Sequence, residues 1–125
     1  MTGSPPPARE RRIDYVEFAS CDPAASRHFF ERVFGWRFEA YGPDYAAFDD
    51  GGLQGGFFRG APATTASGAP LVVLYAAQLA PLQAAVQAHG GVLSRPAFAF
   101  PGGRRFQFIE PGGNELAVWS ERDAE

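Results

Sequence analysis

The fold is decided by residues 13–35, IDYVEFASCDPAASRHFFERVFG. The first eight of these residues are mostly β-branched, aromatic or small and alternate in part, which predicts a strand. Asp22 and Pro23 then give a helix start signal, an N-cap residue followed by proline in the first turn. Gly35 supplies the matching stop signal. The stretch therefore predicts a strand followed directly by a helix over 23–34.

The same order of signals returns later in the chain. An offset of 56 residues aligns Tyr15 with Leu71 and Gly35 with Gly91. Leu71 lies in a second apolar stretch, and a second helix is predicted over 81–88. After each helix come three short strand candidates separated by glycine and proline turns; they begin near Trp36, Tyr45 and Leu53 in the first half and near Gly91, Arg104 and Asn114 in the second. The chain is thus predicted to hold two copies of a βαβββ unit.

Two such units, over 12–59 and 69–120, predict a single α+β domain spanning 12–121. Because neither half can bury its sheet alone, we expect two curved mixed sheets that form one cleft, with the helices on the outside. Residues 1–11 are polar with three consecutive prolines, and we expect a disordered tail there. Residues 60–68 are small and without periodicity, which predicts a linker.

Composition limits the classes of protein that this chain can represent. A length of 125 residues and a formal net charge of −3 fit one soluble domain. The single cysteine, Cys21, excludes an internal disulfide and favours a reducing, cytoplasmic setting. No apolar run approaches membrane-spanning length, and 11 basic against 14 acidic residues form no basic stripe. We therefore expect neither a membrane nor a nucleic acid as partner.

Three stretches carry a family resemblance: residues 13–36, residues 51–60 (GGLQGGFFRG) and residues 108–120 (FIEPGGNELAVWS). Together they resemble the vicinal oxygen chelate superfamily, the fold of glyoxalase I, bleomycin resistance proteins and extradiol dioxygenases. The last stretch is similar to the D-P-x-G-N-x-x-E pattern that ends the family's domain. The resemblance covers nearly all of 12–121. It implies a homodimer, and it implies lyase, isomerase, dioxygenase or drug-binding activity without choosing among them.

Members with chemistry hold one divalent metal ion through four cleft side chains, and an oxygen pair of the substrate chelates that ion. Carried onto this chain, three of the positions fall on Tyr15, Leu71 and Ala117, and the fourth falls on one of residues 54–56, of which only Gln54 has a donor atom. Leucine and alanine have no donor atom, and a neutral tyrosine is a poor ligand. Both histidines fall on the predicted helices, away from the sheets. We therefore expect no metal ion and no other cofactor.

Strand alternation assigns the remaining inner-face side chains once Tyr15 is set toward the cleft. The result is a pocket with aromatic and aliphatic walls and a few polar groups. One strand leaves two registers open, either Arg105 with Gln107 or Arg104 with Phe106 and Phe108. The candidate ligand-binding residues are Tyr15, Glu17, Gln54, Tyr75, Arg105, Gln107, Glu115 and Trp119.

Glu17 is the candidate catalytic residue. A carboxylate on an inner strand face among aromatic rings is partly desolvated, an environment that makes a general acid or base. The alternatives are a structural ion pair with Arg104 or Arg105, and a rim position open to water. The chain also has 12 phenylalanines, more than packing alone needs, so we expect several to line the cavity and the ligand to be flat or apolar.

Three functions fit these observations. The first is a metal-free protein that binds a small apolar or aromatic molecule in the cleft between the repeats. The second is a metal-dependent lyase or dioxygenase with an altered ligand set of Tyr15, Glu17, Gln54 and Glu115. The third is a metal-free isomerase or lyase with Glu17 as its base. The loss of the usual ligands beside an otherwise intact pattern favours the first.

Overall fold

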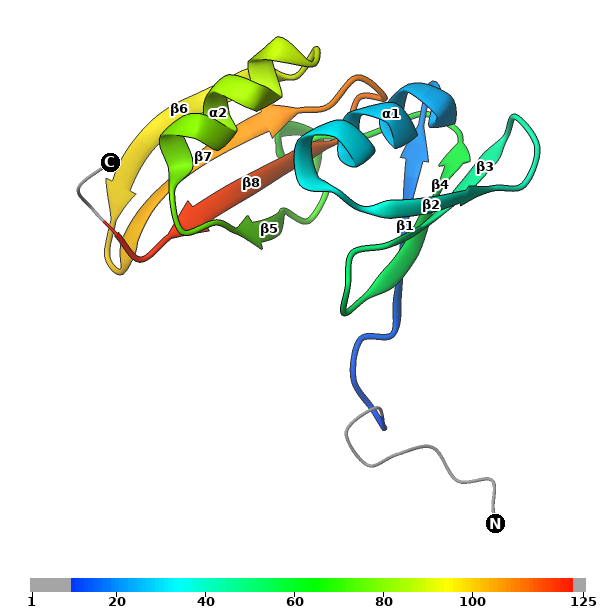
Figure 1. The fold of residues 1–125 in the computed structure, drawn as a ribbon, viewed down its shortest axis with the longest axis horizontal. Coiled ribbons are helices and arrows are strands. Elements are labelled where there is room, and N and C mark those ends of the chain that lie inside the picture. The colour runs from blue at the N-terminus through cyan, green and yellow to red at the C-terminus, as the bar shows by residue number, and fades with distance from the viewer. Residues whose placement is uncertain (1–9, 123–125) are drawn as a thin grey trace.

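The computed structural model describes residues 10–122, which form two βαβββ units in succession (Figure 1). The first unit consists of β1 (Tyr15–Ser20), α1 (Pro23–Phe34), β2 (Arg37–Ala40), β3 (Tyr45–Asp49) and β4 (Gln54–Arg59). The second consists of β5 (Val72–Tyr75), α2 (Leu79–Ala88), β6 (Val92–Phe100), β7 (Gly103–Ile109) and β8 (Glu115–Ser120). The predicted α+β fold of two repeats is confirmed. The tail predicted for residues 1–11 lies almost wholly outside the described residues.

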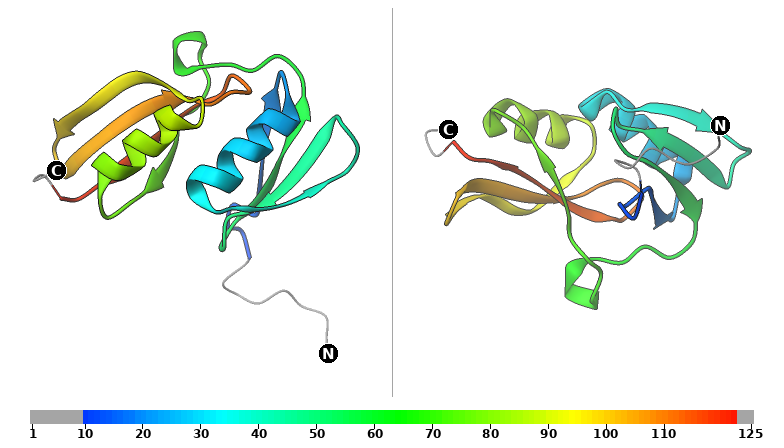
Figure 2. Two further views of the ribbon diagram at one scale, coloured as in Figure 1. Left: turned by 45° about the horizontal axis from the view of Figure 1, so that its top comes forward. Right: turned by 90° about the horizontal axis from the view of Figure 1, so that it is seen from below.

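Each unit builds its own four-stranded mixed sheet. The strand order is β1-β4-β3-β2 in the N-terminal sheet and β5-β8-β7-β6 in the C-terminal sheet. In both, the first strand pairs in parallel with the last and the other pairs are antiparallel. The two helices lie together on one side of the molecule, and the linker between the units passes on the other (Figure 2). We call the side of each sheet away from the helices its open face.

The helix ends follow the sequence signals. The Asp22 side chain accepts a hydrogen bond from the backbone N–H of Ala25, and Gly35 adopts a left-handed conformation with φ 72° just past the last turn of α1. The predicted helix over 23–34 is therefore confirmed at both ends. Helix α2 begins at Leu79, two residues earlier than predicted, because Pro81 is tolerated in a first turn where backbone N–H groups have no partner in the helix. No helix in residues 10–122 has both the length and the apolar character needed to cross a membrane.

A single aromatic core joins the two units. Phe57, Phe106 and Phe108 are completely buried, and the rings of Phe29 in α1 and Phe108 in β7 lie 5.7 Å apart. The expectation that phenylalanines of these strands line a ligand cavity is therefore wrong for these three strand residues. Alternation turns them toward the helices, where each buried ring contributes roughly 1.5–3 kcal/mol. The phenylalanine excess is largely a property of the core.

The turn between β7 and β8 clasps the two units together. Asn114 donates through Nδ2 to the carbonyl of Ala19 (2.7 Å) and to the carboxylate of Glu110 (2.8 Å). Glu110 also accepts from the hydroxyl of Ser26 (2.8 Å) and the backbone N–H of Gly112 (2.6 Å). Burial raises the pKa of Glu110, while these hydrogen bonds oppose the rise. The terminal E-P-G-G-N motif is thus a structural clasp between the repeats.

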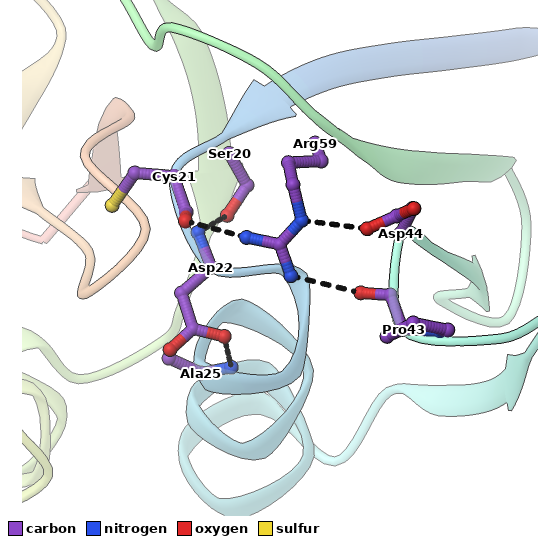
Figure 3. A network of polar contacts seen from close by, with 7 residues as sticks. All are labelled: Ser20, Cys21, Asp22, Ala25, Pro43, Asp44 and Arg59. Carbon is purple, nitrogen blue, oxygen red and sulfur yellow. Dashed lines mark hydrogen bonds and ion pairs between the residues drawn. The ribbon is translucent and has the colours of Figure 1, made fainter.

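Arg59, at the end of β4, ties the β1–α1 junction to the turn before β3 (Figure 3). Its guanidinium donates to the carboxylate of Asp44 (2.6 Å), the carbonyl of Cys21 (3.1 Å) and the carbonyl of Pro43 (3.1 Å). The Cys21 sulfur points away from this cluster and lies 4.0 Å from the carbonyl oxygen of Pro111. Arg59 therefore fixes the backbone of the junction and does not contact the thiol.

Candidate functional site

A hollow of about 460 Å³ lies between the two repeats, beside the edge strands β1 and β5. Most of the side chains that line it are apolar, and its polar side chains are Asp50 and Tyr75. This volume and this composition are typical of small-molecule sites. We call it the inter-repeat hollow; its apolar wall consists of Val16, Phe18, Phe34, Trp36, Phe48, Leu53, Val72, Val73 and Leu74.

The inter-repeat hollow is lined by the strand face opposite to the one expected. Val16 and Phe18 line it, whereas their neighbours Tyr15 and Glu17 are exposed on the open face of the N-terminal sheet. The cause is the position of β1 and β5 at sheet edges, where the helices cover the apolar side chains only in part. The two faces of β1 are therefore assigned as predicted, with Val16 and Phe18 on the helix side, and only the face that lines the space between the repeats differs. Strand β5 contributes the expected Val73 and Tyr75 together with their neighbours Val72 and Leu74.

The open face of the N-terminal sheet has a hollow of its own, about 550 Å³, lined by Tyr15 and Gln54 among others. Beside this hollow, the Tyr45 hydroxyl donates to the Glu17 carboxylate (2.9 Å) and lies 2.6 Å from the Tyr15 hydroxyl. Because Tyr45 gives its one proton to Glu17, Tyr15 is the donor in the second bond. Burial and these two hydrogen bonds raise the pKa of Tyr45. The Tyr45 hydroxyl therefore stays protonated at neutral pH and remains a donor beside Glu17.

Tyr45 was not among the residues expected at the site. Its signal in the sequence is indirect: a Cβ at Gly56 would overlap the Tyr45 ring, so this glycine makes room for the ring. Of the environments expected for Glu17, the exposed side chain fits a position open to water, and its hydrogen-bond donor is Tyr45. Arg104 and Arg105 belong to the other sheet.

On the C-terminal sheet, the register settles which side of β7 faces outward. Arg105 pairs with Trp119 and Gln107 with Ala117, whereas Phe106 and Phe108 lie in the core. Arg105 and Trp119 line a third hollow of about 270 Å³ on the open face. The Tyr75 ring meets Trp119 edge to face at 5.5 Å. Of the eight candidate residues, three thus lie on one open face and five belong to the other sheet.

Glu115 holds the linker against the open face of the C-terminal sheet. Its side chain is 8% exposed, and it accepts hydrogen bonds from the backbone and hydroxyl of Thr65 (2.9 and 2.6 Å), the Ser94 hydroxyl (2.6 Å) and the Gln107 amide (3.2 Å). Burial favours the neutral acid, but these hydrogen bonds outweigh it and lower the pKa of Glu115 to about 2. Protein donors therefore already occupy the carboxylate that was expected to contact a ligand.

Comparison with known proteins agrees with this architecture. The family model of the Glyoxalase/Bleomycin resistance protein/Dioxygenase superfamily matches residues 12–118. The chain belongs to this superfamily. No curated protein sequence matches it.

Several solved structures share the fold of this chain. A glyoxalase-related enzyme from Fulvimarina pelagi is 22% identical, covers 88% of each chain and superposes with a TM-score of 0.73. Lactoylglutathione lyase from Agrobacterium tumefaciens is 18% identical over 93% of this chain and 95% of that one, with a TM-score of 0.69. TioX from Micromonospora sp. ML1 is 22% identical over 88% and 98%, with a TM-score of 0.67. At these identities the similarity shows the fold alone.

The residues at the superfamily's metal positions do not fit a divalent ion. Leu71 and Ala117 have no donor atom, and the Tyr15 hydroxyl is hydrogen-bonded to Tyr45. Within residues 10–122, no three His, Cys, Asp or Glu side chains come together as a metal site would require. His28 and His89 are exposed, on α1 and at the end of α2. These residues therefore lack the set of converging oxygen or imidazole donors that a divalent ion requires.

Proposed function

We propose that this superfamily member binds a small apolar or aromatic molecule in the inter-repeat hollow without a metal ion. The observation that carries the proposal is the hollow itself, about 460 Å³ and lined mostly by apolar side chains. Trp36 stacks on Phe48 at 4.5 Å, and both rings line it, so a flat ligand meets aromatic surface. Asp50 and Tyr75 supply the few polar groups that orient a ligand in such a site.

The donor chemistry supports binding over metal-dependent catalysis. Two of the four ligand positions carry Leu71 and Ala117, and a hard cation needs several oxygen or imidazole donors that converge on it. Glu115, a member of the altered ligand set considered from the sequence, already accepts hydrogen bonds from Thr65, Ser94 and Gln107. Within residues 10–122, neither Glu17 nor Glu115 belongs to a group of three His, Cys, Asp or Glu side chains that could hold a metal ion.

The two tryptophans of the chain allow a direct test, because Trp36 lines the inter-repeat hollow and Trp119 lines the hollow beside Arg105. Their indole N–H signals can be followed separately by NMR and assigned with the Trp→Phe variants. Titration with 2-naphthol, a neutral flat probe, is expected to shift the Trp36 signal saturably. Val72→Phe fills the hollow and is expected to weaken binding at least roughly tenfold, whereas Val92→Phe, at an exposed position of β6, keeps it. An unshifted Trp36 signal, or equal affinity in both variants, contradicts the proposal.

A second candidate function is a metal-free isomerase with Glu17 as base. The Tyr15–Tyr45–Glu17 hydrogen-bond chain favours it, since it places a proton donor beside an accessible carboxylate. The test is turnover of a panel of α-hydroxyketones. Glu17→Gln should abolish any activity and Glu39→Gln, at an exposed position on the same open face of the N-terminal sheet, should leave it intact. No turnover by the unaltered protein removes this candidate.

We also propose a homodimer in the cytoplasm. Apolar side chains remain exposed at or beside the strands, among them Ile13 (78%), Val73 (43%) and Val92 (63%), and β1 and β5 are edge strands. The lone cysteine supports a reducing compartment. Sedimentation analysis should give twice the 13.5 kDa of one chain. A single species at the mass of one chain contradicts the dimer.

A further inference from the structure

Two guanidinium groups meet on the open face of the C-terminal sheet. The Arg95 guanidinium carbon lies 3.8 Å from the ring centre of Phe98, and that of Arg105 lies 5.4 Å from the same ring and 5.7 Å from the ring of Phe100. Among residues 10–122, neither guanidinium has a carboxylate within ion-pair distance. Aromatic rings, not acids, therefore hold two positive charges together here.

Arg105 has hydrogen-bonding capacity that the described chain does not use. Its Nε, like that of Arg104 on the other face of β7, is buried and has no hydrogen-bond partner in the described residues. Guanidinium groups offer five donors in a planar fork, and they match a carboxylate with two parallel hydrogen bonds. An unpaired arginine of this kind is typical of a site for an external anion.

The space beside Arg105 fits a ring. The hollow of about 270 Å³ is lined by Arg105 and three apolar side chains, Val73, Phe100 and Trp119. The Trp119 and Phe100 rings lie 6.3 Å apart, and Tyr75 supports Trp119 from its edge. The Tyr75 hydroxyl donates to the Glu121 carboxylate (2.9 Å), so that acid has a partner other than Arg105.

We propose that this hollow is a second binding site, selective for a planar aromatic carboxylate. The ring lies against Trp119 and Phe100, and the carboxylate accepts hydrogen bonds from Arg105. Arg95 adds a second positive charge on the same face. This site is distinct from the inter-repeat hollow, although Val73 contributes to the wall of both.

The test compares 2-naphthoate with 2-naphthamide, a neutral probe of nearly the same shape. The readouts are the Trp119 indole N–H signal in NMR titrations and the heat of binding in calorimetry. The naphthoate is expected to shift the Trp119 signal and to bind the unaltered protein at least roughly tenfold more tightly than the amide. Arg105→Gln should abolish this preference. Arg104→Gln is the matched control, because Arg104 precedes Arg105 in β7 and so faces the helix side, and it should keep the preference.

Equal affinity of the two probes for the unaltered protein overturns the proposal, and so does a preference that survives in Arg105→Gln. A naphthoate that shifts the Trp36 signal alone also overturns it, while supporting a ligand in the inter-repeat hollow. The proposed function fails separately, through an unshifted Trp36 signal with neutral 2-naphthol. The outcomes for the two hollows are therefore distinguishable.

Discussion

Glu115→Gln removes the charge that fastens the linker to the C-terminal sheet. The carboxylate accepts four hydrogen bonds, two of them from Thr65 of the linker, and its pKa is about 2 against an ordinary value of 4.5. Each unit of pKa difference corresponds to about 1.4 kcal/mol, so ionised Glu115 stabilises the fold by about 3 kcal/mol at neutral pH. Glutamine keeps one acceptor oxygen but turns an NH₂ group toward a donor. We expect the variant to lose about 2–3 kcal/mol of unfolding free energy at pH 7.

The pH dependence has a definite sign. Because the folded-state pKa of Glu115 lies below the unfolded value, the stabilisation is complete above pH 4.5 and is lost as the pH falls toward 2. By pH 3, roughly two-thirds of it has gone. Urea unfolding of the unaltered protein and of Glu115→Gln, at pH 7 and at pH 3, measures both effects. The difference in unfolding free energy between the unaltered protein and Glu115→Gln should be smaller at pH 3 than at pH 7.

A milder variant separates the charge from a single hydrogen bond. Thr65→Val removes the hydroxyl donor and keeps the backbone N–H that also reaches Glu115. It is expected to cost about 1 kcal/mol. A loss of unfolding free energy below about 0.5 kcal/mol in Glu115→Gln at pH 7 would show that the Glu115 carboxylate does not stabilise the fold. A loss that is the same at pH 3 as at pH 7 would show the same.

Three further predictions address other parts of the molecule. Gly112→Ala should cost at least about 2 kcal/mol in urea unfolding, because its Cβ would overlap the hydroxyls of Ser20 and Ser26. Gly52→Ala, whose Cβ would make only an ordinary contact with the Asp50 carboxylate at 3.9 Å, should change stability by less than about 0.5 kcal/mol, and equal costs would contradict the role of the β7–β8 turn. Tyr45→Phe should remove the highest-pH step from an absorbance titration of the tyrosines, because burial and hydrogen bonding raise the pKa of Tyr45. An unchanged titration would contradict the hydrogen bonds that join Tyr45 to Tyr15 and Glu17. Protein purified without added metal or chelator should hold well below one equivalent of nickel, zinc, iron or manganese by mass spectrometry, and one tightly bound equivalent would overturn metal-free binding.

The element order could be predicted because its signals are local. Asp22 caps α1 and Gly35 ends it through contacts within a few residues of each, so the sequence determines both helix ends directly. Alternation likewise placed Arg105 and Gln107 on one face of β7 as one of two options, and pairing with β8 settled the choice. Local patterns were sufficient wherever the determining contacts lie within one element.

The site could be predicted only in part, because its geometry depends on contacts between distant segments. Alternation predicts that Val16 and Tyr15 lie on opposite faces of β1. It does not determine which of the two faces lines the space between the repeats. The donors to Glu115 include Thr65, 50 residues away, and no spacing rule connects the two. The position of Phe98 beside two arginines depends on register shifts within β6, which have no clear sequence signal.

Metal-free binding between the repeats is tested most directly by a crystal structure of the protein, prepared without chelator, in complex with 2-naphthol. Electron density for a flat ring is expected in the inter-repeat hollow, against Trp36 and Val72, with no metal ion beside it. An empty hollow, or a probe whose oxygen coordinates a metal ion near Tyr15 and Gln54, would contradict it.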